Sequence, residues 1–525
     1  MKKFYLFTTI VLCAILLFSC KGDNETANET TVETTTEEII DYEAVRSLKY
    51  ETSDTMMGTV SGALNQELTY EDISEGVKAN EKTGFKFVGW SDGNPEYTRS
   101  DTNLKDDTTI TAMFDYEFRN MPVLDIRTTN YAQIMSKNDY IGAEVTLANT
   151  DGTRQFESIA AEIRGRGNAT WGMEKKSYRL HFDARIDLIE GTDNGAKTWV
   201  LLANHCDQTM LRNHTAFNLG KIMGIPYSTE SMFVELYLNG KYDGVYQVVE
   251  QTQVQENRVD IDDTRTDNSN GYLIELDRYF EGQEDVDFVV VNRIFYSIRS
   301  QINNPQQVEY IKNYLQQIED AVRNNNEAEC YRLIDMDSMV ATYILQEFMK
   351  NIDVGWSSFF MFIEEDYGKM YFGPPWDFDL TAGNDHRLDN GSWDGIYVGN
   401  RQSGFDQRHR WFPILIEYDW FRRLVQNMWE EKKDEIIAYV EEVYQFGQAN
   451  STSFSRNFDR WPIWGWRINQ EPEHVMALNT YKQHLDYLNE WLHARYDWLD
   501  EHFTREEYIT VDPNYGGNNN NNRYR

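Results

Sequence analysis

The segment Phe233-Val-Glu-Leu-Tyr-Leu-Asn-Gly-Lys-Tyr-Asp-Gly-Val-Tyr-Gln-Val-Val-Glu250 predicts a β-hairpin. Its two runs, 233–238 and 242–250, are rich in β-branched and aromatic residues. The Asn-Gly pair between them is the turn that favours right-twisted strands. A second hairpin is predicted from 357–363 and 369–372. The first half of the surrounding region is therefore expected to be rich in strands.

The rest of this region is predicted to be helical. Apolar residues recur at three- and four-residue spacing in the segments 305–324, 337–350, 420–443 and 478–503. Strands followed by helices predict one α+β domain with a helical lobe, from residue 118 to residue 505. A chain of 525 residues has room for this domain and for further modules.

A small all-β module is predicted from residue 46 to residue 116. It contains short alternating runs, which close on Ile110 to Phe114. The run from Gly84 to Gly93, with Ala112 and Phe114 after it, resembles the internalin B-repeat type of bacterial surface module. That resemblance implies a spacer or an adhesion element.

The chain begins with a predicted export signal, residues 1–19. Two lysines precede an apolar run of about fifteen residues, which is too short for an ordinary membrane span. Ser19 and Cys20 resemble the lipobox of bacterial lipoproteins, which implies a lipid anchor on Cys20 and a place in the outer membrane, on its periplasmic or its surface face. Residues 20–45 and 506–525 are predicted to be a disordered tether and a disordered Asn-rich tail.

Two cysteines remain after the signal and the anchor are set aside. Cys206 and Cys330 either pair or stay free, because geometry decides this and the sequence does not. Neither belongs to a CxxC pair or lies at ligand spacing from histidines, so the sequence gives no case for structural zinc.

The chain is strongly acidic, with 50 Lys and Arg against 86 Asp and Glu and a formal charge of -36. Such a charge argues against a nucleic-acid partner. The stretch 164–181 is an exception, since it holds five fixed positive charges and one acid. Gly165 and Gly167 in this stretch let backbone N–H groups approach an anion. It predicts a phosphate site, and the alternative is a basic hairpin that pairs with acidic neighbours.

Carboxylates stand at both ends of the second hairpin. Asp353 precedes it, and Asp377 and Asp379 follow it, so the hairpin can return both ends to one point. Phosphoryl transfer uses one carboxylate to orient the attacking hydroxyl and another to hold Mg²⁺. Protein kinases also place these two aspartates on either side of a short hairpin. The arrangement therefore favours phosphoryl transfer.

Four blocks in this order resemble the CotH kinase family, which comprises atypical, secreted or surface relatives of protein kinases. The resemblance covers about residues 120–505 and implies a kinase fold that uses ATP with Mg²⁺ or Mn²⁺ to phosphorylate Ser or Thr in proteins. The blocks that carry it are Arg164 to Trp171 with Lys175 to Arg179, Trp199 to Asn204 with Asp207 and Leu211 to Asn213, Tyr237 to Tyr246 with Glu250, and Asn351 to Asp353 with Trp376 to Asp379.

The resemblance also implies roles for single residues. Asp353 would be the catalytic aspartate, and Asp377 would bind the metal with Asp379 and Asn384. Lys176, or its neighbour Lys175, would contact the nucleotide phosphates. The remaining predicted nucleotide-binding residues are Arg164, Gly165, Arg166, Gly167, Arg212 and Glu250.

One departure from the kinase pattern leaves the activity open. Kinases often carry a metal-binding asparagine about five residues after the catalytic aspartate, and here that place holds Ser357 or Ser358. Serine is a poorer ligand, so a catalytically inactive pseudokinase is an alternative. A glycosidase with paired carboxylates and a non-catalytic adhesin are the others. A glycosidase, however, leaves the basic stretch without a purpose. The sequence does not identify the protein substrate.

Overall fold

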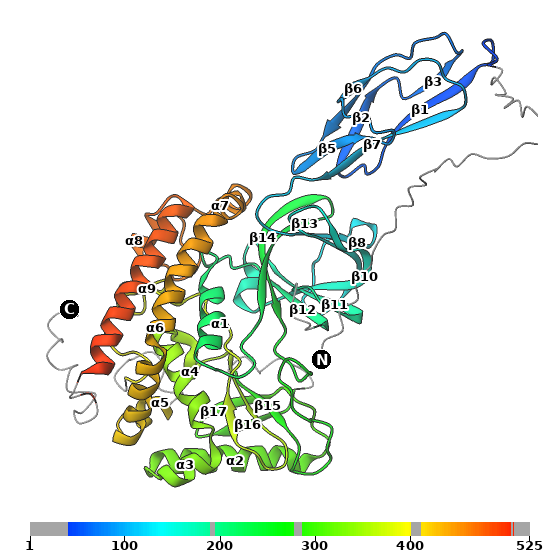
Figure 1. Ribbon diagram of the computed structural model, residues 1–525. Coiled ribbons are helices and arrows are strands. Elements are labelled where there is room, and N and C mark those ends of the chain that lie inside the picture. The colour runs from blue at the N-terminus through cyan, green and yellow to red at the C-terminus, as the bar shows by residue number, and fades with distance from the viewer. Residues whose placement is uncertain (1–39, 190–194, 278–285, 401–410, 506–507, 509–525) are drawn as a thin grey trace, which may run out of the picture.

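The computed structural model describes residues 40–189, 195–277, 286–400, 411–505 and 508. The chain is a mixed α+β protein whose N-terminal part is rich in strands and whose C-terminal part is helical, as predicted (Figure 1). The predicted signal, Cys20, most of the tether and nearly all of the tail lie outside the described residues. In the part that is described, no helix combines the length and apolarity needed to cross a membrane.

The strands of residues 46–116 form two sheets of their own. One has the order β3-β1-β7-β5 and the other β2-β4-β6. Between them lie buried aromatic side chains such as Tyr50, Phe87 and Trp90. The strands are β1 (Arg46–Thr52), β2 (Gly58–Gly62), β3 (Asn65–Leu68), β4 (Val77–Glu81), β5 (Phe85–Trp90), β6 (Thr98–Arg99) and β7 (Thr108–Tyr116).

This module packs directly against the next part of the chain. Its hydrophobic core includes Val123, Ala148 and Tyr237, which belong to the following barrel. The Tyr237 hydroxyl donates to the Gly84 carbonyl at 2.8 Å, and Arg127 forms an ion pair with Asp54 at 2.6 Å. Because the two parts share a hydrophobic core, the module is held in one position against the barrel.

A closed barrel follows, with the order β10-β11-β12-β14-β13-β8-β9. The hairpin predicted from the Asn-Gly turn is confirmed as β13 and β14. Asn239 (φ 52°) and Gly240 (φ 71°) both adopt the positive φ that this turn requires. The strands are β8 (Val123–Thr128), β9 (Ile141–Ala148), β10 (Arg154–Arg166), β11 (Ser177–Ile186), β12 (Ala196–Leu202), β13 (Ser231–Leu238) and β14 (Lys241–Glu250).

A second sheet, of order β16-β17-β15-β18-β19, contains the other predicted hairpin. The four predicted helical segments appear as α2, α4, α6 and α9. The remaining strands are β15 (Tyr272–Leu276), β16 (Phe288–Val291), β17 (Ile294–Ile298), β18 (Phe359–Ile363) and β19 (Met370–Phe372). The helices are α1 (Arg212–Ile222), α2 (Pro305–Arg323), α3 (Glu327–Leu333), α4 (Met336–Met349), α5 (Trp411–Leu415), α6 (Asp419–Ala449), α7 (Ser451–Arg460), α8 (Glu473–Met476) and α9 (Tyr481–Thr504).

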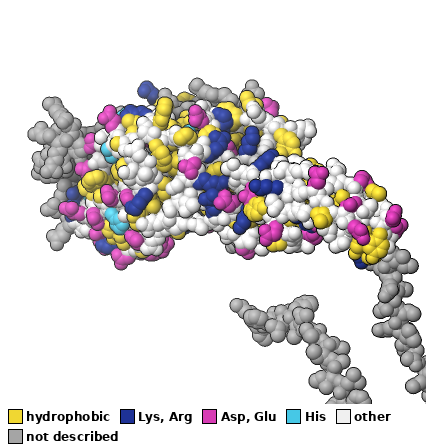
Figure 2. Space-filling model, turned by 90° about the horizontal axis from the view of Figure 1, so that it is seen from above, with side chains coloured by type: hydrophobic (Ala, Val, Ile, Leu, Met, Phe, Trp, Pro, Cys, Tyr) yellow, Lys and Arg dark blue, Asp and Glu magenta, His cyan; other side chains and the backbone are white. Residues whose placement is uncertain are grey.

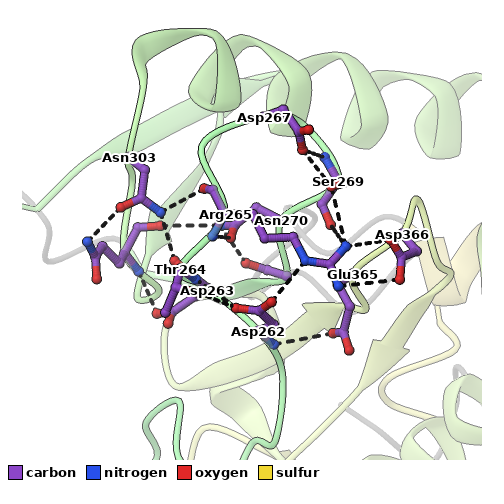
Figure 3. Close-up of polar contacts among 12 residues, drawn as sticks. Asp262, Asp263, Thr264, Arg265, Asp267, Ser269, Asn270, Asn303, Glu365 and Asp366 are labelled. Carbon is purple, nitrogen blue, oxygen red and sulfur yellow. Dashed lines mark hydrogen bonds and ion pairs between the residues drawn. The ribbon is translucent and has the colours of Figure 1, made fainter.

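A polar network anchors the turn between β18 and β19 to the loop before β15 (Figure 3). The Arg265 guanidinium binds Asp262 at 2.9 Å and also binds Asp366 in the turn. The Asn303 amide donates to the backbone carbonyls of Asp263 and Arg265 at 2.8 Å, so the start of α2 joins the same network. One end of the hairpin is thereby fixed, while its other end carries the predicted catalytic residues.

Cys206 and Cys330 are both buried and free, which settles the question that the sequence left open. Burial raises the pKa of both thiols.

A fully buried ion pair joins α4 to α9, and its removal is expected to be costly. Arg495 lies 2.8 Å from Glu347, and its guanidinium also donates to the carbonyls of Trp393 and Gly395. Arg495→Met leaves Glu347 charged and unpaired, so we expect a loss of about 3–5 kcal/mol in the free energy of unfolding. Urea unfolding measures it. The double variant with Glu347→Gln should recover part of the loss, and a cost of Arg495→Met below about 1 kcal/mol would contradict the expectation.

Candidate functional site

A cavity of about 1140 Å³ lies between the barrel, the β18–β19 hairpin and the loop after β19. This volume lies somewhat above the usual range for small-molecule sites, roughly 300–1,000 Å³. Its walls have opposite charges, with arginines from the barrel on one side and aspartates from the hairpin ends on the other. The residues that line it include Arg164, Arg166, Gly167, Arg179, Glu275, Asp353, Ser358, Trp376, Asp377 and Asp379.

The cationic wall comes from two neighbouring strands. Arg164 and Arg166 alternate along β10, and Arg179 on β11 is the direct cross-strand partner of Arg164. Like charges placed opposite each other destabilise a sheet. The pKa of Arg166 is lowered to about 10, mainly by burial and also by Arg179 and Arg164, while Asp377 and Glu275 oppose the shift. Burial and Arg164 likewise lower the pKa of Arg179. The fold thus holds three cations together against their mutual repulsion.

Arg166 is the arginine best placed to bind a ligand. Arg164 donates to the Lys137 carbonyl and stacks on Tyr140, and Arg179 donates to Gln251 at 2.8 Å. Arg166 stacks on Trp376, with 5.3 Å from its guanidinium carbon to the ring centroid. Within the described ranges its guanidinium has no hydrogen-bond or ion-pair partner. Its planar set of N–H donors therefore faces the cavity ready for a phosphate or a carboxylate.

The anionic wall is built from two short segments. Asp353 lies in the single turn at 352–355, directly after α4, and the Asn351 side chain caps its backbone N–H at 2.9 Å. Asp377 and Asp379 follow β19. Asp377 has a φ of 65°, a left-handed conformation that few non-glycine residues adopt but that aspartate tolerates.

The aspartates repel one another. Burial raises the pKa of Asp379 well above its usual value, and Asp377 and Asp353 raise it further. Burial also raises the pKa of Asp377, although Arg166 and the Ser358 hydroxyl oppose this effect. Protein atoms surround the Asp377 side chain, but one side of it remains exposed to the cavity. Among the described residues the Asp379 carboxylate has no hydrogen-bond or ion-pair partner. Arg212 lowers the pKa of Asp379 and so offsets part of the increase.

These carboxylates suit a divalent cation that a phosphate also binds. In the parts of the chain that are described, no group of three or more His, Cys, Asp or Glu side chains is arranged to hold a metal ion alone. Mg²⁺, however, usually takes one or two protein carboxylates and completes its shell with water and substrate phosphates. Asp377 and Asp379 meet that requirement, because both face the cavity and repel each other.

The structure does not bring the two predicted lysines into the cavity. The Lys176 ammonium caps the turn at 169–172 by donating to the carbonyls of Trp171 and Met173 at 2.8 Å. Lys175 is fully buried between the barrel and α7, and it donates to the carbonyls of Ala203 and Val245 and to the Asn457 side chain. Both ammonium groups are bound to oxygen atoms of the protein, and arginines take the place in the cavity that was predicted for a lysine.

Of the other residues predicted to bind the nucleotide, some line the cavity and some do not. Gly167 lines the cavity, but the Gly165 N–H is bound to the Ser136 carbonyl, and Trp171 covers the glycine. Arg212 is buried in an ion pair with Asp207, and Glu250 accepts the Glu230 N–H at 2.9 Å; neither lines the cavity.

Asn384 also lies outside the cavity lining, but it touches the acidic segment from behind. Its amide donates to the Asp379 carbonyl at 2.8 Å, so it holds the backbone of that aspartate and contributes no ligand to the cavity.

Arg179, Trp376 and Asn213 line the cavity, although the sequence indicated them only as members of the blocks that resemble the CotH family. The side-chain oxygen of Asn213, Oδ1, accepts the Phe378 N–H at 2.7 Å and so fixes the segment between Asp377 and Asp379. The position of Arg179 in the cavity follows from its cross-strand pairing with Arg164. That pairing can be predicted only once the register of β10 and β11 is known.

These features define an α+β protein with one cavity that can hold an anion and a cation side by side. The comparison with known families agrees, because the model of the CotH family, described as CotH kinase protein, matches residues 163–499. The chain belongs to the CotH family. No curated protein matches the chain.

The buried Lys175 gives a prediction for the pH dependence of stability. Burial lowers its pKa to about 7 from 10.5, while Asp243 opposes the shift. Between these values the unfolded chain binds more protons than the folded one, so this lysine makes stability rise with pH, by up to about 1.4 kcal/mol per unit. We therefore expect the difference in unfolding free energy between wild type and Lys175→Met to move in favour of wild type from pH 7.5 to pH 9.5. Urea unfolding at both pH values checks this, and a constant difference would contradict it.

Proposed function

We propose that this protein is an exported lipoprotein kinase that transfers the γ-phosphate of ATP to Ser or Thr hydroxyls of proteins. One observation carries the proposal: the Arg166 guanidinium and the Asp379 carboxylate face the same cavity, and neither has a hydrogen-bond or ion-pair partner among the described residues. A ligand that satisfies both must combine an anion with a cation, and a nucleotide polyphosphate with its metal does so. Membership of a family described as kinase proteins supports the same conclusion.

In this proposal the cationic and the anionic wall of the cavity have different roles. Arg166 binds phosphate oxygens, while Arg164 and Arg179 add positive potential beside it. Asp377 and Asp379 would hold Mg²⁺ or Mn²⁺, which when bound neutralises charge on the phosphates. Asp353 orients the acceptor hydroxyl and takes its proton. The hydroxyl oxygen bonds to the γ-phosphorus, the bond from that phosphorus to the bridging oxygen breaks, and ADP leaves.

The rest of the chain fits an exported enzyme. The lipid anchor proposed for Cys20 and the tether of residues 20–45 would hold the domain at the outer membrane. The acidic side chains that spread over the surface in Figure 2 suit a soluble exterior, and Lys and Arg side chains gather near the middle of that face. A glycosidase would use the carboxylates but would leave the cationic wall of Arg164, Arg166 and Arg179 without a ligand.

The test is transfer of labelled phosphate from ATP, with Mn²⁺ or Mg²⁺, to the chain itself and to generic protein acceptors. Mass spectrometry then locates the modified residues. We expect phosphoserine or phosphothreonine. Binding of nucleotide without any transfer would establish the pseudokinase, and the absence of both would refute the proposal.

A further inference from the structure

Ser358 lies directly before β18, where the sequence lacks the asparagine that kinases use as a metal ligand. Its hydroxyl donates to Oδ2 of Asp377, with 3.3 Å between the two oxygens. In the described part of the chain, no hydrogen bond or ion pair engages Oδ1 of Asp377. The serine thus holds one oxygen of this carboxylate and leaves the other for a ligand.

The backbone of Ser358 is also held in place by hydrogen bonds. It has a φ of 59°, so Ser358 and Asp377 both adopt the left-handed conformation on facing segments. The Ser358 N–H bonds to the buried Glu275 carboxylate, which in turn accepts Arg299 at 2.7 Å. Arg299 also binds Asp277 at 2.8 Å. Non-glycine residues keep this conformation where their surroundings over-determine it, and here a chain of charged contacts from β15 and β17 does so.

We infer that Ser358 is a positioning residue that orients the Asp377 carboxylate for the metal of a bound metal–nucleotide complex. The inference rests on the proposed function. In place of an asparagine amide that binds a metal directly, this chain has a hydroxyl that acts through the aspartate. The serine is therefore a substitute for the missing asparagine, and its presence does not by itself indicate an inactive protein.

The experiment measures Mn²⁺ binding to the full chain by electron paramagnetic resonance, with and without a non-hydrolysable ATP analogue. The variants are Ser358→Ala, Ser358→Gly and Ser358→Asn. Alanine and glycine both remove the hydroxyl, but only glycine relaxes the positive φ. Asparagine tolerates this φ and keeps a hydrogen-bond donor.

With the analogue present, we expect Ser358→Ala and Ser358→Gly to weaken Mn²⁺ binding by about 5- to 10-fold, which is the size of one lost hydrogen bond. Ser358→Asn should stay within about two-fold of wild type, because it restores a donor. Thermal unfolding of each variant shows whether the fold is intact. Since glycine suits the backbone here, Ser358→Gly keeps the test valid if Ser358→Ala fails to fold.

The inference is overturned if all three variants bind Mn²⁺ as wild type does. It is also overturned if Ser358→Gly matches wild type, since the backbone and not the hydroxyl would then matter, or if Ser358→Asn is as weak as Ser358→Ala. Failure of the proposed function looks different: wild type itself would then show no Mn²⁺ binding that depends on the analogue.

Discussion

Asp353→Asn is expected to lower the rate of phosphoryl transfer by about 10²- to 10⁴-fold, the usual contribution of a general base. Asparagine has nearly the same shape but cannot take a proton from the acceptor hydroxyl. Asp353 lies on the acidic wall but is not one of the proposed metal ligands, so the affinity for ATP should change little. Initial rates of label transfer and calorimetric titration with ATP separate the two effects.

The matched control for this variant is Asp183→Asn on β11, which makes the same chemical change at an exposed site. It should transfer phosphate as wild type does. If Asp353→Asn kept more than a tenth of the wild-type rate, Asp353 would not be the base. A parallel loss of ATP affinity would instead place Asp353 among the groups that bind the nucleotide.

Arg166→Met is expected to weaken ATP binding by about 10- to 100-fold, because it removes charge-assisted hydrogen bonds to phosphate. The matched control is Lys176→Met, which also removes one positive charge from the same stretch of sequence. Lys176 is bound to two carbonyls outside the cavity lining, so its loss should change the affinity less than two-fold. Calorimetric titration of both variants measures the difference.

The thermal stability of Arg166→Met provides a second test of the role of Arg166. Since Arg166 and its neighbours Arg164 and Arg179 repel one another, Arg166→Met should leave the thermal stability of the ligand-free protein unchanged or raise it. A variant that bound ATP poorly and also unfolded at a markedly lower temperature would show that Arg166 supports the fold. Weakened binding in Lys176→Met instead of Arg166→Met would restore the lysine predicted from the sequence.

Much of the fold was predictable because its signals are local. The turn at Asn239 and Gly240 requires positive φ at both residues, and few other residue pairs accept it. The helices follow from apolar spacing, as in the segment that forms α2, where Asn304 and Pro305 also mark the start. Asp353 and Asp377 were predicted to meet because a hairpin returns its ends to one place.

The cationic wall was not predictable to the same degree. The stretch 164–181 offered five cations, but its sequence does not say which of them face the cavity. That depends on the alternation of side chains along β10 and on the pairing of Arg164 with Arg179. Lys176 precedes β11 and caps a turn, while Lys175 is bound between the barrel and α7. Both outcomes depend on contacts between distant segments.

The metal–nucleotide site is tested most directly by calorimetric titration of the full chain with a non-hydrolysable ATP analogue, with and without Mn²⁺. The opposed walls predict one binding event per chain that is strong with Mn²⁺ and weak without it. Asp379→Asn should weaken the dependence on Mn²⁺, because it removes the charge of one of the two carboxylates proposed to hold the metal. Absence of binding under both conditions, or binding that neither Mn²⁺ nor Asp379→Asn changes, would contradict the proposed site.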